Sequence, residues 1–215
     1  MTTYYTKRLF LWVFLPAFIF TVGCSSVPKT SKNWPQKVLK TLSLREKIAQ
    51  MMIYRMHLKY KDVTPEKWKE ITRLLDGDGI GGIHLWSGDG SSSIAIMNEI
   101  QKRSRIPIIF DADIERGFGQ RFPSGTDFPP MMAITATGNP ENAYEIGKIV
   151  ATESRAAGIH WNLSPVVDVN NNPLNPIINT RSFSEDADIV SEFSKKYTKG
   201  LQDYGMIATS KHFPG

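Results

Sequence analysis

Residues 80–112, IGGIHLWSGDGSSSIAIMNEIQKRSRIPIIFDA, contain a strand–helix–strand pattern from which the fold class follows. Ile80–Trp86 is typical of a strand, Ser93–Ser104 of a helix and Ile106–Ala112 of a second strand. Two strands joined through a helix within about 30 residues form a βαβ unit, in which the strands run parallel. The apolar run Ile106-Pro-Ile-Ile-Phe predicts that this strand is buried on both faces, as in a covered parallel sheet.

The same alternation continues on both sides of this segment. The pattern predicts helices at Pro65–Leu75, Gly138–Gly158 and Asp186–Tyr204, and strands at Gln50–Tyr54, within Ile159–Val169 and at Met206–Ser210. Ser43 and Glu46 form a possible capping box at a further helix start. A doubly wound sheet and a (β/α)8 barrel both fit five such repeats. A complete barrel needs about 250 residues, so a barrel in this chain would be incomplete.

The N-terminus has the pattern of a bacterial lipoprotein signal. A short basic start precedes the apolar run Leu9–Val22, which is too short to span a membrane comfortably, and Cys24 follows directly after a glycine. We therefore predict a signal peptide at residues 1–23, a lipid on Cys24 and a tether at residues 24–40. The protein would then be a lipid-anchored membrane protein of the cell envelope, facing the periplasm or the outer membrane. A plain signal peptide or a signal anchor with a chance cysteine is the alternative.

Composition narrows the possible functions. The chain has 215 residues, of which 41% are hydrophobic and 22% charged, as in ordinary globular proteins. Its formal net charge is +5, but no run of Lys and Arg stands out, so we predict no nucleic-acid partner. A single cysteine cannot form a disulfide within the chain.

In an α/β barrel, functional groups gather at the C-terminal ends of the strands. Polar residues stand at or after the ends of four predicted strands. They are His84 for Ile80–Trp86; Asp111, Asp113, Glu115 and Arg121 for Ile106–Ala112; Asp168 and Arg181 for the strand within Ile159–Val169; and Lys211 and His212 for Met206–Ser210.

Three features of these residues bear on function. Asp111 and Asp113 share a face of an extended segment, but only Glu115 adds a nearby ligand, so we predict neither a metal nor a cofactor. A carboxylate here could instead accept hydrogen bonds from sugar hydroxyls, or could simply cap a turn. Lys211 and His212 precede Phe-Pro-Gly, which indicates a site held by a rigid turn, although simple packing also explains the pair.

Four segments, in this order, resemble family 3 glycoside hydrolases, and specifically their β-N-acetylglucosaminidase branch. The segments are Ile80-Gly-Gly-Ile-His-Leu-Trp, Asp113-Ile-Glu-Arg-Gly-Phe-Gly-Gln-Arg-Phe, Leu163-Ser-Pro-Val-Val-Asp-Val with Asn179-Thr-Arg-Ser-Phe-Ser-Glu-Asp, and Lys211-His-Phe-Pro-Gly. The resemblance is greatest to lipoprotein members in which this domain precedes a serine-hydrolase-like domain. It implies a TIM (β/α)8 barrel, truncated after about five strands, over residues 41–215. Arg116 departs from the family pattern, which has glycine at this position, where a tight turn is expected.

The resemblance also implies a function. It assigns binding of the sugar to Asp113, Arg121, Arg181, Lys211 and His212, and no catalytic residue to this chain. The implied reaction removes terminal β-linked N-acetylglucosamine with retention, through a covalent glycosyl-enzyme. Its Asp nucleophile and His acid/base are expected beyond Gly215, so this chain alone is expected to be inactive. The expected substrates are amino-sugar glycans, including peptidoglycan fragments. A β-glucosidase-type exo-hydrolase and a non-catalytic glycan-binding surface lipoprotein are the alternatives.

Overall fold

The structure is a computed structural model that describes residues 33–213, and the chain divides into two units, residues 1–40 and 41–215. Helix α1 (Trp34–Thr41) buries none of its residues and occupies the end of the segment predicted to be a tether. The predicted signal peptide and Cys24 lie outside the described residues. Among the residues that are described, no helix combines the length and the apolar character needed to cross a membrane.

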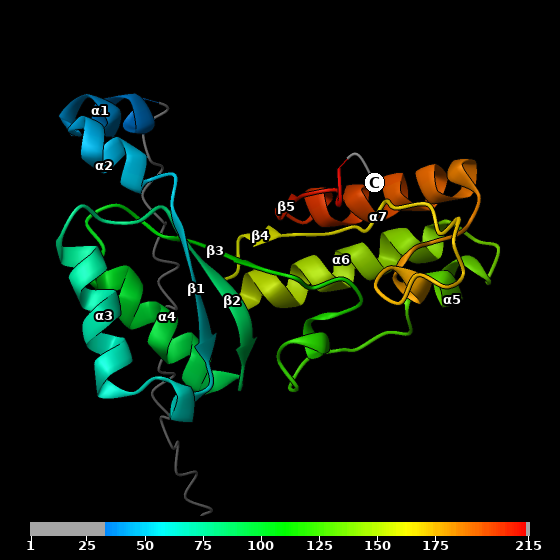
Figure 1. The fold of residues 1–215 in the computed structure, drawn as a ribbon, viewed down its shortest axis with the longest axis horizontal. Coiled ribbons are helices and arrows are strands. Elements are labelled where there is room, and N and C mark those ends of the chain that lie inside the picture. Colours follow the sequence, from blue (N-terminus) through cyan, green and yellow to red (C-terminus); the bar gives the residue numbers. More distant parts are fainter. Residues whose placement is uncertain (1–32, 214–215) are drawn as a thin grey trace, which may run out of the picture. The chain divides into compact units, whose positions relative to one another are not determined.

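The second unit is built on one parallel five-stranded sheet (Figure 1). Its strands are β1 (Ile53–Leu58), β2 (Gly82–Gly88), β3 (Ile109–Ala112), β4 (Trp161–Asn162) and β5 (Ile207–Ala208). Each strand pairs with the next one along the chain, so the spatial order is the order in the sequence. A doubly wound sheet reverses its strand order at a switch point, whereas a (β/α)8 barrel does not. The sheet is therefore the first five strands of a TIM-type barrel, as predicted.

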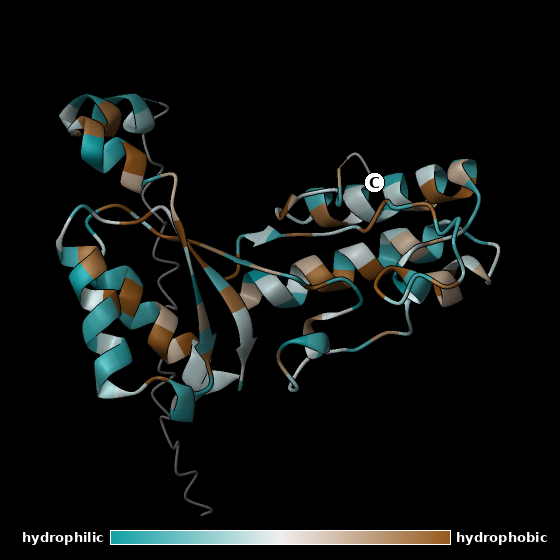
Figure 2. Ribbon diagram, in the orientation of Figure 1, coloured by the Kyte–Doolittle hydropathy of each residue, from teal (hydrophilic) through white to brown (hydrophobic). Residues whose placement is uncertain are grey.

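Helices lie at the expected places before and between the strands, and α5 is one that the sequence pattern did not predict. They are α2 (Leu44–Ala49), α3 (Pro65–Asp76), α4 (Ser91–Arg103), α5 (Met131–Thr135), α6 (Glu141–Ala156) and α7 (Ala187–Asp203), with 3-10 turns η1 (Tyr60–Asp62), η2 (Phe118–Gln120) and η3 (Asn179–Arg181). The predicted capping box is present at α2, where the Ser43 hydroxyl accepts from Glu46 N–H and the Glu46 carboxylate accepts from Ser43 N–H. Hydrophilic and hydrophobic bands alternate along α3, α6 and α7 (Figure 2), as expected for helices with one face on a core.

The prediction that the run Ile106-Pro-Ile-Ile-Phe is buried on both faces is wrong. Phe110 and Ala112 of β3 are buried in the core, but Ile109, which points to the other face, is 41% exposed. Ile53 at the start of β1 and Ile207 in β5 are also exposed. Buried residues of α3, α4, α6 and α7 form one core with one face of the sheet, and the other face is the inner surface of the partial barrel.

The first strand was also misplaced. We predicted it at Gln50–Tyr54 from an apolar run, but β1 begins at Ile53, and Met51 and Met52 before it are exposed. In the strand itself only Met56 and Leu58 are buried, so its signal is an alternation and not a continuous apolar stretch.

The pair α6 and α7 packs at backbone contact. A Cβ atom at Gly147 of α6 would lie 2.4 Å from the carbonyl oxygen of Tyr197, and one at Gly200 of α7 would lie 2.2 Å from that of Tyr144. Both glycines therefore permit a separation that no larger residue allows. This packing fixes the position of Tyr197, whose hydroxyl reaches the site described next.

Candidate functional site

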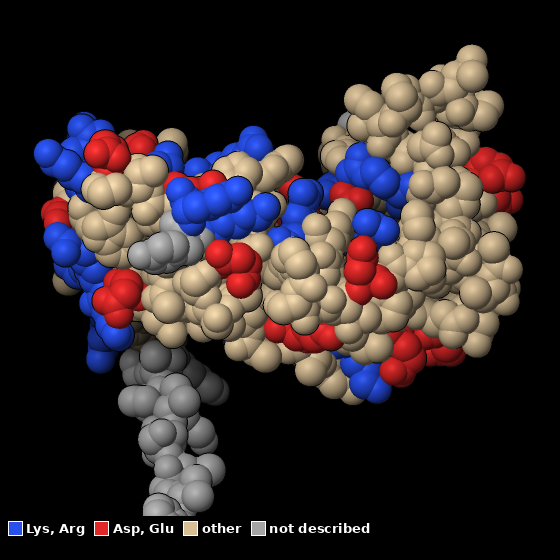
Figure 3. All heavy atoms as spheres, turned by 90° about the horizontal axis from the view of Figure 1, so that it is seen from below, with Lys and Arg blue, Asp and Glu red and all other residues tan. Residues whose placement is uncertain are grey.

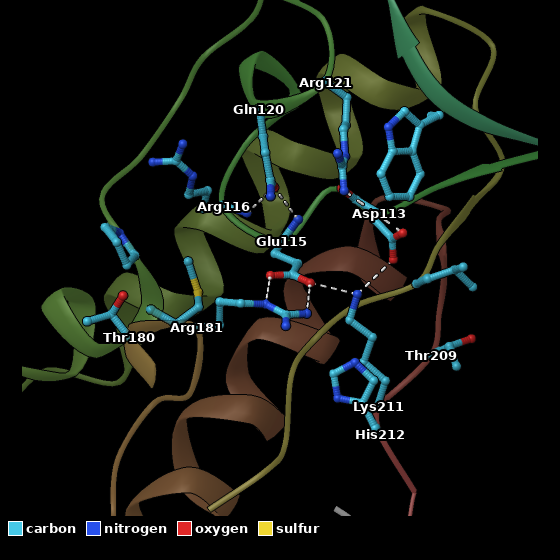
Figure 4. A pocket seen from close by; sticks show the side chains of 14 residues that line it. Asp113, Glu115, Arg116, Gln120, Arg121, Thr180, Arg181, Thr209, Lys211 and His212 are labelled. Atoms are coloured by element: carbon cyan, nitrogen blue, oxygen red, sulfur yellow. Dashed lines mark hydrogen bonds and ion pairs between the residues drawn. The ribbon is translucent and has the colours of Figure 1, made fainter. Parts of the chain in front are cut away.

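The ends of the strands surround a cavity of about 690 Å³ (Figure 4). All five predicted sugar-binding residues line it, although they come from the segments that follow three different strands, β3, β4 and β5. The lining residues are Trp86, Asp113, Glu115, Arg116, Gln120, Arg121, Pro130, Met131, Leu163, Thr180, Arg181, Thr209, Lys211 and His212. The structure thus brings the five side chains to one cavity, and their role in binding a sugar remains a prediction.

The segment after β3 is held rigidly by buried polar groups. Asn162 of β4 accepts a hydrogen bond from Ile114 N–H (3.0 Å) and donates one to Ile114 C=O (2.7 Å), which forms a closed pair of bonds. The hydroxyl of Tyr197 donates to the carbonyl oxygen of Glu115 at 2.9 Å. Burial strongly raises the pKa of this phenol, so Tyr197 stays protonated and remains a donor. Asp113 and Glu115, on either side of Ile114, are consequently fixed in direction.

Glu115 is the centre of the charge network. Arg181 donates to it from Nε (2.9 Å) and Nη2 (2.7 Å), in a bidentate pair, and Lys211 Nζ lies 2.7 Å from Oε1. Burial would raise the pKa of this carboxyl, but the hydrogen bonds from Arg181 and Lys211 outweigh that effect and lower the pKa to about 2. Glu115 is therefore ionised at any neutral pH, and it holds two cations at the cavity wall.

Asp113 keeps one carboxylate oxygen available. Its Oδ1 lies 2.7 Å from Lys211 Nζ, whereas its Oδ2 lies 4.0 Å from Arg121 Nη2, which is too long for a hydrogen bond. Arg121 is instead held by the backbone, because its Nε donates to the carbonyl oxygen of Asp113 at 3.0 Å. Oδ2 can therefore accept a hydrogen bond from a ligand in the cavity.

His212 is positioned by Asp168. The Oδ2 atom of Asp168 lies 2.7 Å from His212 Nδ1 and accepts from His212 N–H at 3.1 Å. The neighbouring residue Lys211 is fixed through its backbone, since its N–H donates to Pro165 C=O and its C=O accepts from Val167 N–H. The two segments that resemble the family pattern, around residues 163–169 and 211–213, thus hold each other at the cavity.

Trp86 lines the cavity, and two arginine side chains lie against its ring. The guanidinium carbon of Arg55 is 3.8 Å from the Trp86 ring centroid, and that of Arg121 is 4.7 Å from it. Both separations suit cation–π attraction. The indole ring thereby helps to fix the Arg121 side chain.

Arg116 does not occupy the tight turn that the family pattern suggested. The backbone with positive φ is at Gly117 (φ 134°), where a Cβ atom would also lie 2.3 Å from the carbonyl oxygen of Thr126. Arg116 lines the cavity, and its Nη2 lies 3.3 Å from Asp127 Oδ2. Glycine is thus needed one residue later than expected, and Arg116 is a side chain at the site.

Sequence reasoning missed part of this arrangement. It considered Glu115 only as a possible metal ligand, and it did not single out Gln120, whose Oε1 accepts from the N–H groups of Glu115 and Arg116. Spacing along a chain cannot show which cation pairs with which carboxylate. Within residues 33–213, no group of three or more His, Cys, Asp and Glu side chains is placed to hold a metal ion.

Positive and negative side chains are interspersed over the face shown in Figure 3, without one continuous basic surface. The cavity itself combines the carboxylates of Asp113 and Glu115 with several basic groups, of which Arg181 and Lys211 are held in place by these carboxylates. Such a site offers both acceptors and donors to an uncharged polyol.

Comparison with known proteins identifies the family. The pattern of the glycosyl hydrolase family 3 N-terminal domain matches residues 43–215. The chain belongs to glycosyl hydrolase family 3. Among curated relatives of this glycosyl hydrolase, a β-N-acetylglucosaminidase/β-glucosidase of Cellulomonas fimi is 31% identical over 182 residues, which are 85% of this chain and 31% of the relative.

Solved structures agree with this assignment. A family 3 β-N-acetylglucosaminidase from Paenibacillus sp. is 30% identical with a TM-score of 0.70, covering 81% of this chain and 34% of that one. A β-glucoside phosphorylase is 28% identical with a TM-score of 0.73, covering 85% of this chain and 31% of that one. This family 3 chain therefore spans about a third of the length of these proteins.

Proposed function

We propose that this cavity binds the terminal β-linked N-acetylglucosamine of a glycan, and that the full-length protein hydrolyses that linkage with retention. The observation that carries the proposal is the convergence of Asp113, Arg121, Arg181, Lys211 and His212 on one cavity of sugar-binding size. The names of the C. fimi and Paenibacillus relatives support an amino-sugar substrate.

The charge network supports a neutral ligand over a phosphate. Arg181 and Lys211 are both held by Glu115, and Lys211 also lies against Asp113, so their charge is largely balanced within the protein. Charged donors and acceptors make stronger hydrogen bonds with hydroxyls than neutral groups do. A rigid set of such groups can orient a pyranose ring and can bind it more tightly as it distorts toward the transition state.

The catalytic groups are proposed from the family resemblance. Retention requires a nucleophile, here an Asp, that forms a covalent glycosyl-enzyme, and an acid/base, here a His. We assign neither role to a described residue, and propose that both belong to a part of the full-length protein outside this chain. The described cavity would supply the binding contacts.

A β-glucoside is the second candidate substrate, because the names of two of the matched proteins include it. We expect the full-length protein to cleave p-nitrophenyl β-N-acetylglucosaminide with a higher kcat/KM than the matched β-glucoside. Preference for the glucoside would favour the second candidate, and turnover of neither would favour a glycan-binding protein without catalysis. Proton NMR of the first product should show the β-anomer, and an initial α-anomer would contradict retention.

We also propose that the mature protein is anchored by a lipid on Cys24, in the cell envelope, where peptidoglycan fragments are within reach. The support is the basic start, the short apolar run and the cysteine that follows it. Cells that express the protein should incorporate a labelled fatty acid into it, and Cys24→Ser should abolish the label. Equal labelling of the variant would contradict the anchor.

A further inference from the structure

Two polar residues behind the cavity have no role in the function proposed so far. His84 of β2 and Asp111 of β3 are direct register partners on neighbouring strands. Neither lines the cavity, and the Asp111 side chain is 1% exposed. An ionised carboxylate in such a buried position is costly unless it is paired. The burial of Asp111 therefore needs a physical explanation.

The contacts of His84 connect the buried carboxylate to the cavity. Its Nδ1 lies 2.5 Å from Asp111 Oδ1, and its Nε2 lies 3.6 Å from Oδ2 of Asp113. With the Asp111 carboxylate as the acceptor, we assign the hydrogen to Nδ1, which donates it to Asp111. That bond fixes the rotation of the imidazole ring, and the opposite edge of the ring then faces Asp113.

The Oδ2 atom of Asp113 is the oxygen that remains available for a ligand. Lys211 holds Oδ1 at 2.7 Å, while His84 and Arg121 lie near Oδ2 at 3.6 and 4.0 Å, beyond hydrogen-bond distance. The His84 ring thus limits the rotation of the Asp113 carboxylate, and it leaves Oδ2 available to accept a hydrogen bond. Because Asp111 holds the opposite edge of the His84 ring, the ring cannot rotate away from Asp113.

We propose that His84, held by Asp111, is a positioning residue that sets the direction of the Asp113 carboxylate for a sugar hydroxyl. The inference rests on the proposed function, since it concerns how Asp113 meets its ligand. His84 acts through Asp113 and does not itself touch the sugar. The same geometry in a purely structural pair would stabilise the sheet without any effect that depends on Asp113.

A double-mutant cycle in the full-length protein separates these cases, with affinity for N-acetylglucosamine measured by isothermal titration calorimetry. His84→Asn keeps a donor close to Asp111 but removes the ring edge that faces Asp113. We expect it to weaken binding about tenfold, the effect of one impaired hydrogen bond to a charged group. His84→Gln, which can place a polar group near Nε2, should restore part of this loss. In an Asp113→Asn background, His84→Asn should cause no further loss.

Different results would contradict the proposed function and the positioning role of His84. If Asp113→Asn leaves the affinity unchanged, the proposed function fails. If Asp113→Asn weakens binding but His84→Asn does not, or if the two losses simply add, the positioning role is wrong. His57→Asn, on β1 outside the cavity, is the matched control and should bind normally.

A second measurement does not depend on sugar or on the His84 variants. In protein labelled with ¹⁵N-histidine, NMR should show a protonated Nδ1 on His84 with a hydrogen-bonded proton, and Asp111→Asn should shift that proton upfield. An unprotonated Nδ1, or no change in Asp111→Asn, would overturn the assigned hydrogen bond.

Discussion

Replacing Lys211 with Met is expected to weaken binding of N-acetylglucosamine by about 100-fold, the equivalent of one or two charge-assisted hydrogen bonds. The Lys211 ammonium lies 2.7 Å from both Asp113 Oδ1 and Glu115 Oε1. Two of its three donors can satisfy these carboxylates, which leaves the third for a ligand in the cavity that it lines. Without the cation, the two carboxylates also lose their shared partner.

Titration calorimetry on the full-length protein measures the loss, and a matched lysine provides the control. Lys195→Met makes the same substitution at an exposed residue of α7 that does not line the cavity, and it should leave the affinity unchanged. A Lys211→Met protein that melts like the wild type and binds the sugar equally well would show that the ammonium does not contact the ligand.

Acidification is expected to destabilise the protein through Glu115, and Glu115→Gln should remove that part of the pH dependence. The folded-state pKa of about 2 lies below the ordinary value of 4.5. Its contribution to stability is therefore complete above about pH 4.5 and is lost as the pH falls toward 2. The shift corresponds to on the order of 3 kcal/mol at neutral pH.

The variant should also be less stable at neutral pH, because Arg181 and Lys211 lose the carboxylate that both contact. Removing one partner of a buried pair costs roughly 3–5 kcal/mol. Urea denaturation at several pH values between 7 and 3 gives both results. Glu141→Gln, which removes an exposed ion pair with Lys196, should change little. Parallel pH profiles for Glu115→Gln and the wild type would contradict the assigned pKa.

Much of the fold follows from local signals in the sequence. The helix predicted to begin at Pro65 begins there, and the helix predicted to begin at Asp186 begins one residue later, with Asp186 as its N-cap. The strand limits were harder to predict because β4 and β5 have only two residues each, which is too few for any periodicity. For β1, the apolar pair Met51–Met52 led to a strand predicted too early in the chain. The true strand is marked by alternating buried and exposed residues near its end.

The sequence predicted five residues that line the candidate site, but it did not predict which side chains pair with one another. The rule that strand ends converge, together with the family resemblance, selected the five residues that line the cavity. No sequence pattern showed that Glu115 would pair with both Arg181 and Lys211, because those residues lie 66 and 96 positions further along the chain. For the same reason the contact between His84 and Asp111 required the strand register, which only the structure supplies.

A crystal structure of the full-length protein with N-acetylglucosamine tests the central claim most directly. We predict that the sugar occupies the described cavity, with one hydroxyl within hydrogen-bond distance of Asp113 Oδ2 and another polar atom of the sugar within that distance of Lys211 Nζ. A saturating concentration of sugar that leaves this cavity empty, or a sugar bound away from both side chains, would contradict the account.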